Sequence, residues 1–148
     1  MAGAFISVKK RTADKMSIKK LEVEEIAGIM QLKDNFMESF PCEKGEWVQW
    51  LISNVENPRV LIVGNVIDGE IKSYLVALDN VIPPLSVQVH ILFFYSGGDM
   101  EQNMAMINML NNWAKEKGAL KIRGVCQNIK VFEKYGAEQK GILGGWDL

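Results

Sequence analysis

The only side chain of the segment 85–95 that titrates near neutral pH is the single histidine of the sequence, His90. The segment is otherwise mostly apolar and contains no Asp or Glu. One interpretation makes His90 a general base that accepts a proton directly or through a water molecule. The other makes it a half-buried histidine of a sheet, hydrogen-bonded or simply solvated. Both interpretations stay open at this stage.

The sequence contains few residues that could support thiol or metal chemistry. Cys42 and Cys126 are too few for a disulfide scaffold, and one histidine is too few for a Cys/His zinc motif. We interpret both cysteines as reduced thiols, although a single bridge between them stays open. The sequence predicts no metal site.

The composition describes an ordinary globular domain. Of 148 residues, 48% are hydrophobic and 24% charged, which excludes an intrinsically disordered chain. The 17 basic residues are balanced by 18 acidic ones, which argues against an electrostatic nucleic-acid binder. No apolar run approaches the roughly 20 residues that span a bilayer, and the start lacks a signal-peptide core. We therefore expect a cytoplasmic protein without membrane association.

The first third of the chain is predicted to hold two helices. Residues 1–15 are expected to form an arm or an extra strand, followed by a single domain over 16–148. Alternating polarity predicts an edge strand over 16–21. Helical spacing of apolar residues predicts helices over 23–40 and 45–55. The second helix carries a stripe that includes two tryptophans, which either pack in the core or border a substrate, namely Trp47 and Trp50.

The middle of the chain is predicted to form an antiparallel meander. Strands are expected over 60–67, 70–80 and 85–95, joined by turns at Asp68-Gly69 and Pro83-Pro84. In the third strand, alternation places the odd positions on one face, namely Val87, Val89, Ile91 and Phe93.

The last third is predicted to be helix, strand, helix, strand. The ranges are 101–117, 120–125, 128–135 and 139–143. The first helix carries methionines that either fill the core or line a groove, namely Met100, Met104, Met106 and Met109. The strand at 85–95, this helix and the strand at 120–125 form a βαβ unit, which implies parallel pairing.

This element order resembles the GNAT superfamily of acyl-CoA-dependent N-acyltransferases from about Met16 onward. The family's phosphate-loop helix ends in Ala-Lys, two residues and Gly, as do Ala114, Lys115 and Gly118. Its C-terminal signature is similar to the segment 132–137, FEKYGA. The resemblance implies an α+β (mixed α/β) fold with a central mixed sheet of about six to seven strands, flanked by four helices.

The resemblance also implies a site for acetyl-CoA. The strands at 85–95 and 120–125 would diverge, and the pantetheine arm would insert between them. Backbone amides of the loop and helix start would hold the pyrophosphate. The implied cofactor-binding residues are Phe93, Phe94, Tyr95, Gly97, Gly98, Gln102, Asn103, Met104 and Ala105.

The implied leaving-group acid differs from the family pattern. Where many members have a proton-donating Tyr, this sequence has Phe132. Tyr135 lies three residues on, and it either donates this proton or packs in the core. The family's acidic base is also missing from the strand at 85–95, which leaves His90 as the candidate. In addition, Asp99 and Glu101 place negative charge beside the expected phosphates.

The resulting hypothesis is an N-acyltransferase that transfers acetyl from acetyl-CoA to a small amine or a protein amine by direct attack. The alternative is a catalytically inactive GNAT-fold module that serves in binding or structure, within a viral particle or a larger complex. The tail 144–148, GGWDL, either docks on a second copy or larger assembly or covers the chain's own sheet.

Overall fold

The computed structural model describes residues 17–33, 42–97, 100–125, 130–139, 141 and 146. The predicted N-terminal arm, the predicted final strand over 139–143 and the C-terminal tail therefore lie wholly or largely outside the described residues. Among the described helices, none is long and apolar enough to cross a membrane.

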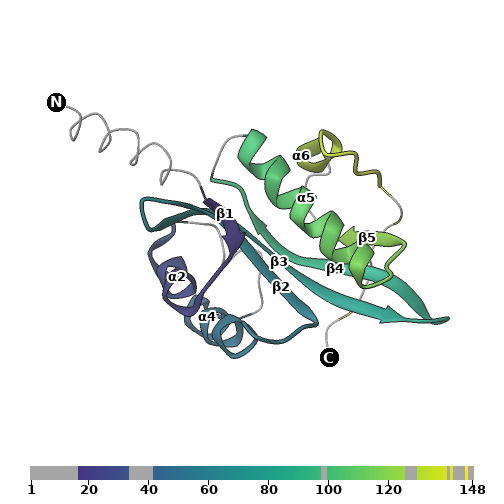
Figure 1. The fold of residues 1–148 in the computed structure, drawn as a ribbon, viewed down its shortest axis with the longest axis horizontal. Coiled ribbons are helices and arrows are strands. Elements are labelled where there is room, and N and C mark those ends of the chain that lie inside the picture. Colours follow the sequence, from purple (N-terminus) through teal and green to yellow (C-terminus); the bar gives the residue numbers. More distant parts are fainter. Residues whose placement is uncertain are drawn as a thin grey trace, which may run out of the picture.

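The core of the fold is a five-stranded mixed sheet in the order β1-β2-β3-β4-β5 (Figure 1). The strands are β1 Ser17–Lys20, β2 Val60–Ile67, β3 Glu70–Ile82, β4 Ser86–Tyr95 and β5 Lys121–Gly124. The first four pair antiparallel, and β4 and β5 pair parallel, as the predicted βαβ unit required. The predicted fold class is confirmed. The described residues supply five strands, rather than six or seven, because two predicted segments lie largely outside them.

Helices cover both faces of the sheet. Their bounds are α2 Val23–Ala27, η1 Gly28–Gln31, α4 Lys44–Ser53, α5 Met100–Glu116 and α6 Lys130–Glu133. In Figure 1, α2 and α4 lie on one side of the sheet, and α5 and α6 lie on the other. We call these the α4 face and the α5 face.

The prediction of one continuous helix over 23–40 is wrong. The α-helix ends at Ala27, the chain tightens into the 3₁₀ helix η1 from Gly28, and Leu32 is already extended, with ψ 135°. Glycine at position 28 favours this break, since it stabilises a helix less than other residues do. Residues 34–41 lie outside the described part of the chain.

The hairpin between β2 and β3 forms as the sequence predicts. Asp68 and Gly69 have positive φ values of 52° and 80°, the combination that a two-residue type I′ turn requires. At the other end of β3, the strand continues to Ile82 before the Pro83-Pro84 turn. This long β3–β4 hairpin extends past the helices at one end of the sheet (Figure 1).

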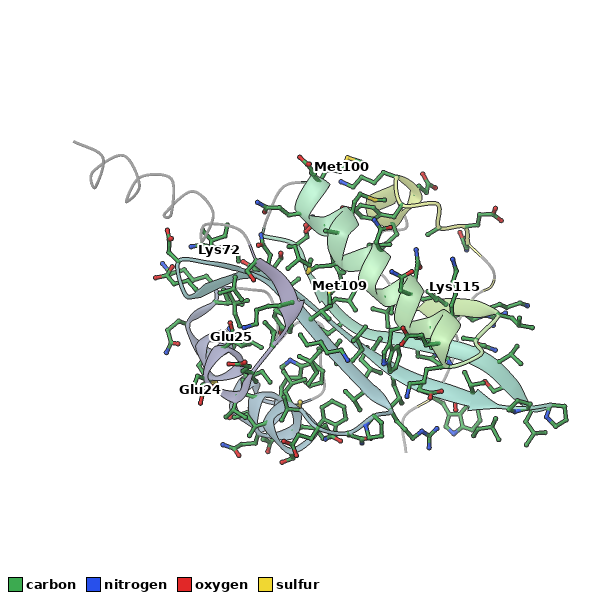
Figure 2. The ribbon with its side chains drawn as sticks, in the orientation of Figure 1. Glu24, Glu25, Lys72, Met100, Met109 and Lys115 are labelled. Atoms are coloured by element: carbon green, nitrogen blue, oxygen red, sulfur yellow. The ribbon has the colours of Figure 1, made fainter. Side chains whose placement is uncertain are left out.

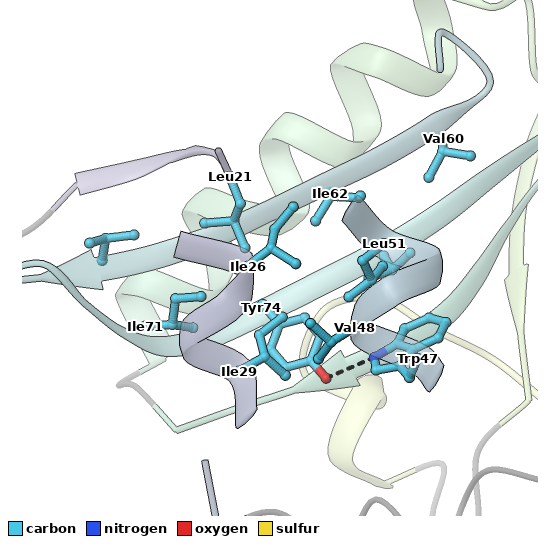
Figure 3. Packing of buried hydrophobic residues seen from close by; sticks show 12 residues of the cluster. Leu21, Ile26, Ile29, Trp47, Val48, Leu51, Val60, Ile62, Ile71 and Tyr74 are labelled. Carbon is cyan, nitrogen blue, oxygen red and sulfur yellow. Dashed lines mark hydrogen bonds between the residues drawn. The ribbon is translucent and has the colours of Figure 1, made fainter. Parts of the chain in front are cut away.

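Each sheet face has its own apolar cluster. The cluster on the α4 face includes Ile26, Ile29, Leu51 and Tyr74, all fully buried (Figure 3). The cluster on the α5 face is built from Leu75, Val89, Met106, Leu110 and their neighbours. Because both faces are covered, the middle of β3 and all of β2 except its last residue, Ile67, are buried.

Candidate functional site

The pairing between the two parallel strands, β4 and β5, ends about halfway along β4. Pairing between β4 and β5 runs from Gln88–Lys121 to Ile91–Gly124 and stops there. β4 continues to Tyr95, still paired with β3 on its other side. The predicted divergence of these strands stays a prediction, because β5 ends at Gly124 and residues 126–129 lie outside the described part of the chain. We call the end of the pairing, at Ile91 and Gly124, the fork.

A β-bulge lies at the fork. Val76 pairs with Phe93 and Ala77 pairs with Ile91, so Leu92 is an extra residue in β4. Ile91 packs in the α5-face cluster, whereas Leu92 and Phe93 both pack in the α4-face cluster. The prediction that Phe93 shares a face with Val87, Val89 and Ile91 is therefore wrong, because the bulge reverses the alternation.

His90 lies one residue before the fork, on the α4 face. It pairs with Leu78 of β3 and Arg123 of β5, and Leu78 packs against the α4-face cluster. The His90 ring is half-buried, and its Nε2 lies 3.4 Å from the side-chain nitrogen of Asn80. In this orientation, the Asn80 amide donates and Nε2 accepts, which leaves Nδ1 to carry the ring hydrogen.

An aromatic group supports β4 beyond the fork on this face. The indole N–H of Trp47 donates to the hydroxyl of Tyr74 over 3.2 Å, inside the core (Figure 3). Phe93 stacks on Tyr74 with ring centroids 5.1 Å apart, and Trp50 stacks on Trp47 at 5.5 Å. Trp47 is a core residue at 4% exposure, whereas Trp50 reaches the surface at 37%. Tyr74, which the sequence analysis did not single out, holds this group together.

Tyr135 lies on the opposite face from His90. It packs in the α5-face cluster beside Phe94, with ring centroids 6.4 Å apart. Phe132 meets the same Phe94 ring edge-on at 5.6 Å. The structure therefore places the two predicted proton-transfer residues on different faces of β4, each next to the segment at the fork.

The loop from β4 to α5 is tied to the sheet by polar side chains. The Asn103 side-chain N–H donates to the hydroxyl of Ser96, and Asn65 donates to the Gln102 carbonyl oxygen over 2.6 Å. Asn103 is 3% exposed, and its own Oδ1 has no partner within the described residues. Met104 and Ala105 are half-buried on the next turn, and Gly98 lies outside the described residues. Met106 is fully buried, whereas Met100 is exposed at the start of α5 (Figure 2).

Gly97 is required by a close backbone approach. A Cβ at this position would lie 2.1 Å from the carbonyl oxygen of Lys72, a backbone atom that cannot rotate away. We expect Gly97→Ala to lower the free energy of unfolding by about 1–3 kcal/mol, as other overpacked sites do.

Urea denaturation measures this effect, with Gly45→Ala in α4 as the matched control. A Cβ at Gly45 meets nothing within 4 Å, so this variant should be unchanged or up to about 1 kcal/mol more stable. Equal stability of the Gly97→Ala variant and the wild type would contradict the close approach.

Within the described residues, no three His, Cys, Asp or Glu side chains gather as a metal site would require. Beyond Ile91 this edge of β4 pairs with no strand among the described residues, and a helix start and one imidazole lie near it. These features suit the binding of an extended ligand and a proton transfer beside it.

Neither a protein-family model nor a curated protein sequence matches the chain. Several solved structures, in contrast, are similar to the chain. An acetyltransferase from Trypanosoma brucei superposes with a TM-score of 0.69 at 15% identity, covering 90% of this chain and 99% of the other. Glucosamine-6-phosphate N-acetyltransferase from Arabidopsis thaliana gives 0.65 at 17% identity, covering 89% and 97%. AAC(6')-Iy, in complex with the bisubstrate analogue CoA-S-monomethyl-acetylneamine, gives 0.70 at 14% identity, covering 90% and 97%.

At such identities the similarity is one of fold. The chain has the fold of the GNAT N-acetyltransferases over nearly its whole length, as the resemblance in the sequence predicted. Fold alone does not determine activity, so function has to be argued from the fork and its side chains.

Proposed function

We propose that this GNAT-fold chain transfers an acetyl group from acetyl-CoA to a primary amine. The observation that carries the proposal is the fork: β5 stops pairing at Gly124 while β4 continues past Ile91, with a bulge at Leu92. A strand edge without a partner strand is a ready site for an extended, amide-bearing arm, which adds to the sheet as another strand would.

The residues at the fork suit acetyl-CoA. The backbone of Phe93, Phe94 and Tyr95 would hold the pantetheine amides, and Gly97, Gly98 and the first turn of α5 would face the pyrophosphate. A 17-residue helix presents free N–H groups and a positive dipole end there. From that turn, the proposal includes Gln102, Asn103, Met104 and Ala105. Bound acetyl-CoA supplies an activated acetyl thioester.

The chain's own side chains would move the protons. His90 would take a proton at Nε2 from the ammonium group of the acceptor, directly or through one water molecule, once the Asn80 amide that donates to this nitrogen turns away. The neutral amine nitrogen would then bond to the acetyl carbon as the carbon–sulfur bond of the thioester breaks, and the nitrogen would lose its second proton to solvent. Tyr135 would protonate the departing thiolate. N–H groups near Phe94 and Tyr95 would stabilise the charge that develops on the carbonyl oxygen.

The acceptor is not determined by the fold. Structures similar to this chain bear the names of enzymes for aminoglycosides, glucosamine-6-phosphate and ribosomal-protein alanine. We therefore propose that the acceptor is a small amine or a protein amine, without choosing between these two classes.

The first test is calorimetric titration of the wild-type protein with acetyl-CoA and with CoA. We expect micromolar binding, and we expect Ala105→Trp to weaken it by about a hundredfold, because an indole on the half-buried side of the first turns fills the space for the phosphates.

Asn112→Trp provides the control, since it adds the same indole at an exposed position two turns further along α5. It should bind like the wild type. No binding by the wild type up to millimolar coenzyme would overturn the proposal and leave the inactive binding module as the better hypothesis.

A further inference from the structure

We infer that the amine acceptor carries an anionic group, a phosphate or a carboxylate, which binds on the α4 face of β4 and β5 next to the fork. This inference rests on the proposed function, and it names the class of acceptor for the same site. Its basis is a set of hydrogen-bond donors that the strand register brings together.

The register places five polar side chains on one face of three neighbouring strands. Gln88 pairs with Asn80 on one side and with Lys121 on the other, and His90 pairs with Arg123. Val89 and Ile122, which alternate with these residues, pack in the α5-face cluster. The five side chains therefore point to the α4 face. We call Asn80, Gln88, His90, Lys121 and Arg123 the donor face.

The donor face has the chemistry of an anion site. Lys121 and Arg123 are exposed, whereas Asn80, Gln88 and His90 are half-buried beside them. Neither cation forms a salt bridge with any described residue. The one carboxylate nearby in β3, Asp79, alternates with Asn80 and so points to the other face, where it accepts from the backbone N–H of Val81.

Arginine and lysine together bind phosphate or carboxylate well, since a guanidinium offers two parallel N–H donors and an ammonium adds a point charge. The half-buried amide side chains of Asn80 and Gln88 add neutral N–H donors, and they bring little negative charge that would repel an anion. A polycationic amine would be repelled here, because it would meet two positive charges that no described acidic residue neutralises.

The location matches the reaction. Arg123 pairs with the residue next to the fork, and Lys121 lies two residues earlier in the same strand. At about 3.3 Å per residue, the pairs Gln88–Lys121 and Ile91–Gly124 are about 10 Å apart. An acceptor whose anionic group binds Arg123 and Lys121 therefore extends its amine towards His90 and the fork when the two groups are a few bonds apart.

The test measures how tightly matched amines bind to the CoA-saturated protein and, in parallel, how fast the same amines accept acetyl groups. Phosphoethanolamine against ethanolamine tests phosphate. The series 4-aminobutanoate, butylamine and putrescine tests carboxylate, neutral and cationic groups at similar length. We expect at least one anionic amine to bind about tenfold or more tightly than its neutral partner, and putrescine to bind most weakly.

Arg123→Gln should reduce this preference to about twofold or less, with the affinity for acetyl-CoA unchanged. The control is Lys115→Gln, which removes one exposed positive charge from α5 on the opposite face of the sheet (Figure 2). This variant should keep the full preference. Circular dichroism confirms that both variants fold.

Two results would overturn the inference while leaving the proposed function intact: CoA binding with tighter binding of neutral or cationic amines, or an anion preference that survives in Arg123→Gln. Weaker acetyl-CoA binding in Arg123→Gln would also overturn it, because the donor face would then serve the coenzyme. No CoA binding by the wild type would overturn the proposed function and this inference with it.

Discussion

The variant His90→Gln will transfer acetyl groups about 10²–10⁴-fold more slowly than the wild type at saturating substrates, the usual contribution of a general base. Glutamine keeps a polar side chain next to Asn80, so the local packing and hydrogen bonding change little. What disappears is the one imidazole that the described residues bring next to the fork. The measurement is kcat from thiol release, at the amine concentration that saturates the wild type.

Two further measurements separate catalysis from structure. The affinity of His90→Gln for acetyl-CoA and its thermal unfolding should match the wild type. Asn80→Ala should lower kcat by about tenfold or less, because it removes the partner that orients the ring rather than the ring itself. Full activity of His90→Gln would show that His90 is only a half-buried residue of the sheet, the second interpretation of the sequence.

Local patterns were sufficient for most of the fold. The helix α4, the strand β2 and the turn at Asp68-Gly69 follow from spacing and turn chemistry within a few residues. The parallel pairing of β4 and β5 follows from the βαβ order. These features depend on neighbours in the sequence, and so the sequence alone predicts them.

Features that depend on tertiary contacts were not predicted. The segment 23–40 has helical apolar spacing, yet the chain leaves the helix at Gly28, where Ile29 enters the core. The bulge at Leu92 was missed because the run Ile91–Tyr95 is apolar throughout, and a period of two contains no signal for an inserted residue. As a result, Phe93 was predicted to lie on the wrong face of the sheet.

The candidate site was predicted only in part. The segment at the fork and the helix start were predicted from the family resemblance. His90 was predicted because it is the single histidine of the sequence. The donor face could not be predicted, since Lys121 and Arg123 reach Gln88 and His90 only through the register of two strands more than thirty residues apart. Strand register is set by packing across the sheet, and a single sequence does not determine it.

Deletion of Leu92 will leave the sheet folded and remove the proposed acetyl-CoA site. Without Leu92, the residues Ile91, Phe93, Phe94 and Tyr95 alternate strictly, and each keeps its present face and its partner in β3. The loss of one partly buried leucine should lower the free energy of unfolding by about 1–3 kcal/mol. Without the bulge, however, β4 would keep beyond Ile91 the direction that it has alongside β5. We therefore expect acetyl-CoA affinity to fall by about a hundredfold or more, since the donors for the ligand are no longer in position.

The matched control for this deletion is Leu92→Ala, which loses the same side chain but keeps the extra residue. Urea denaturation should show a similar loss of stability in both variants, and calorimetry should show near-normal acetyl-CoA binding only in Leu92→Ala. If both variants lose binding equally, the leucine side chain matters rather than the bulge. If the deletion variant binds acetyl-CoA normally, the fork is not the coenzyme site. The comparison thus separates the extra backbone residue of the bulge from the leucine side chain, and it tests whether a ligand can add to the sheet there as another strand.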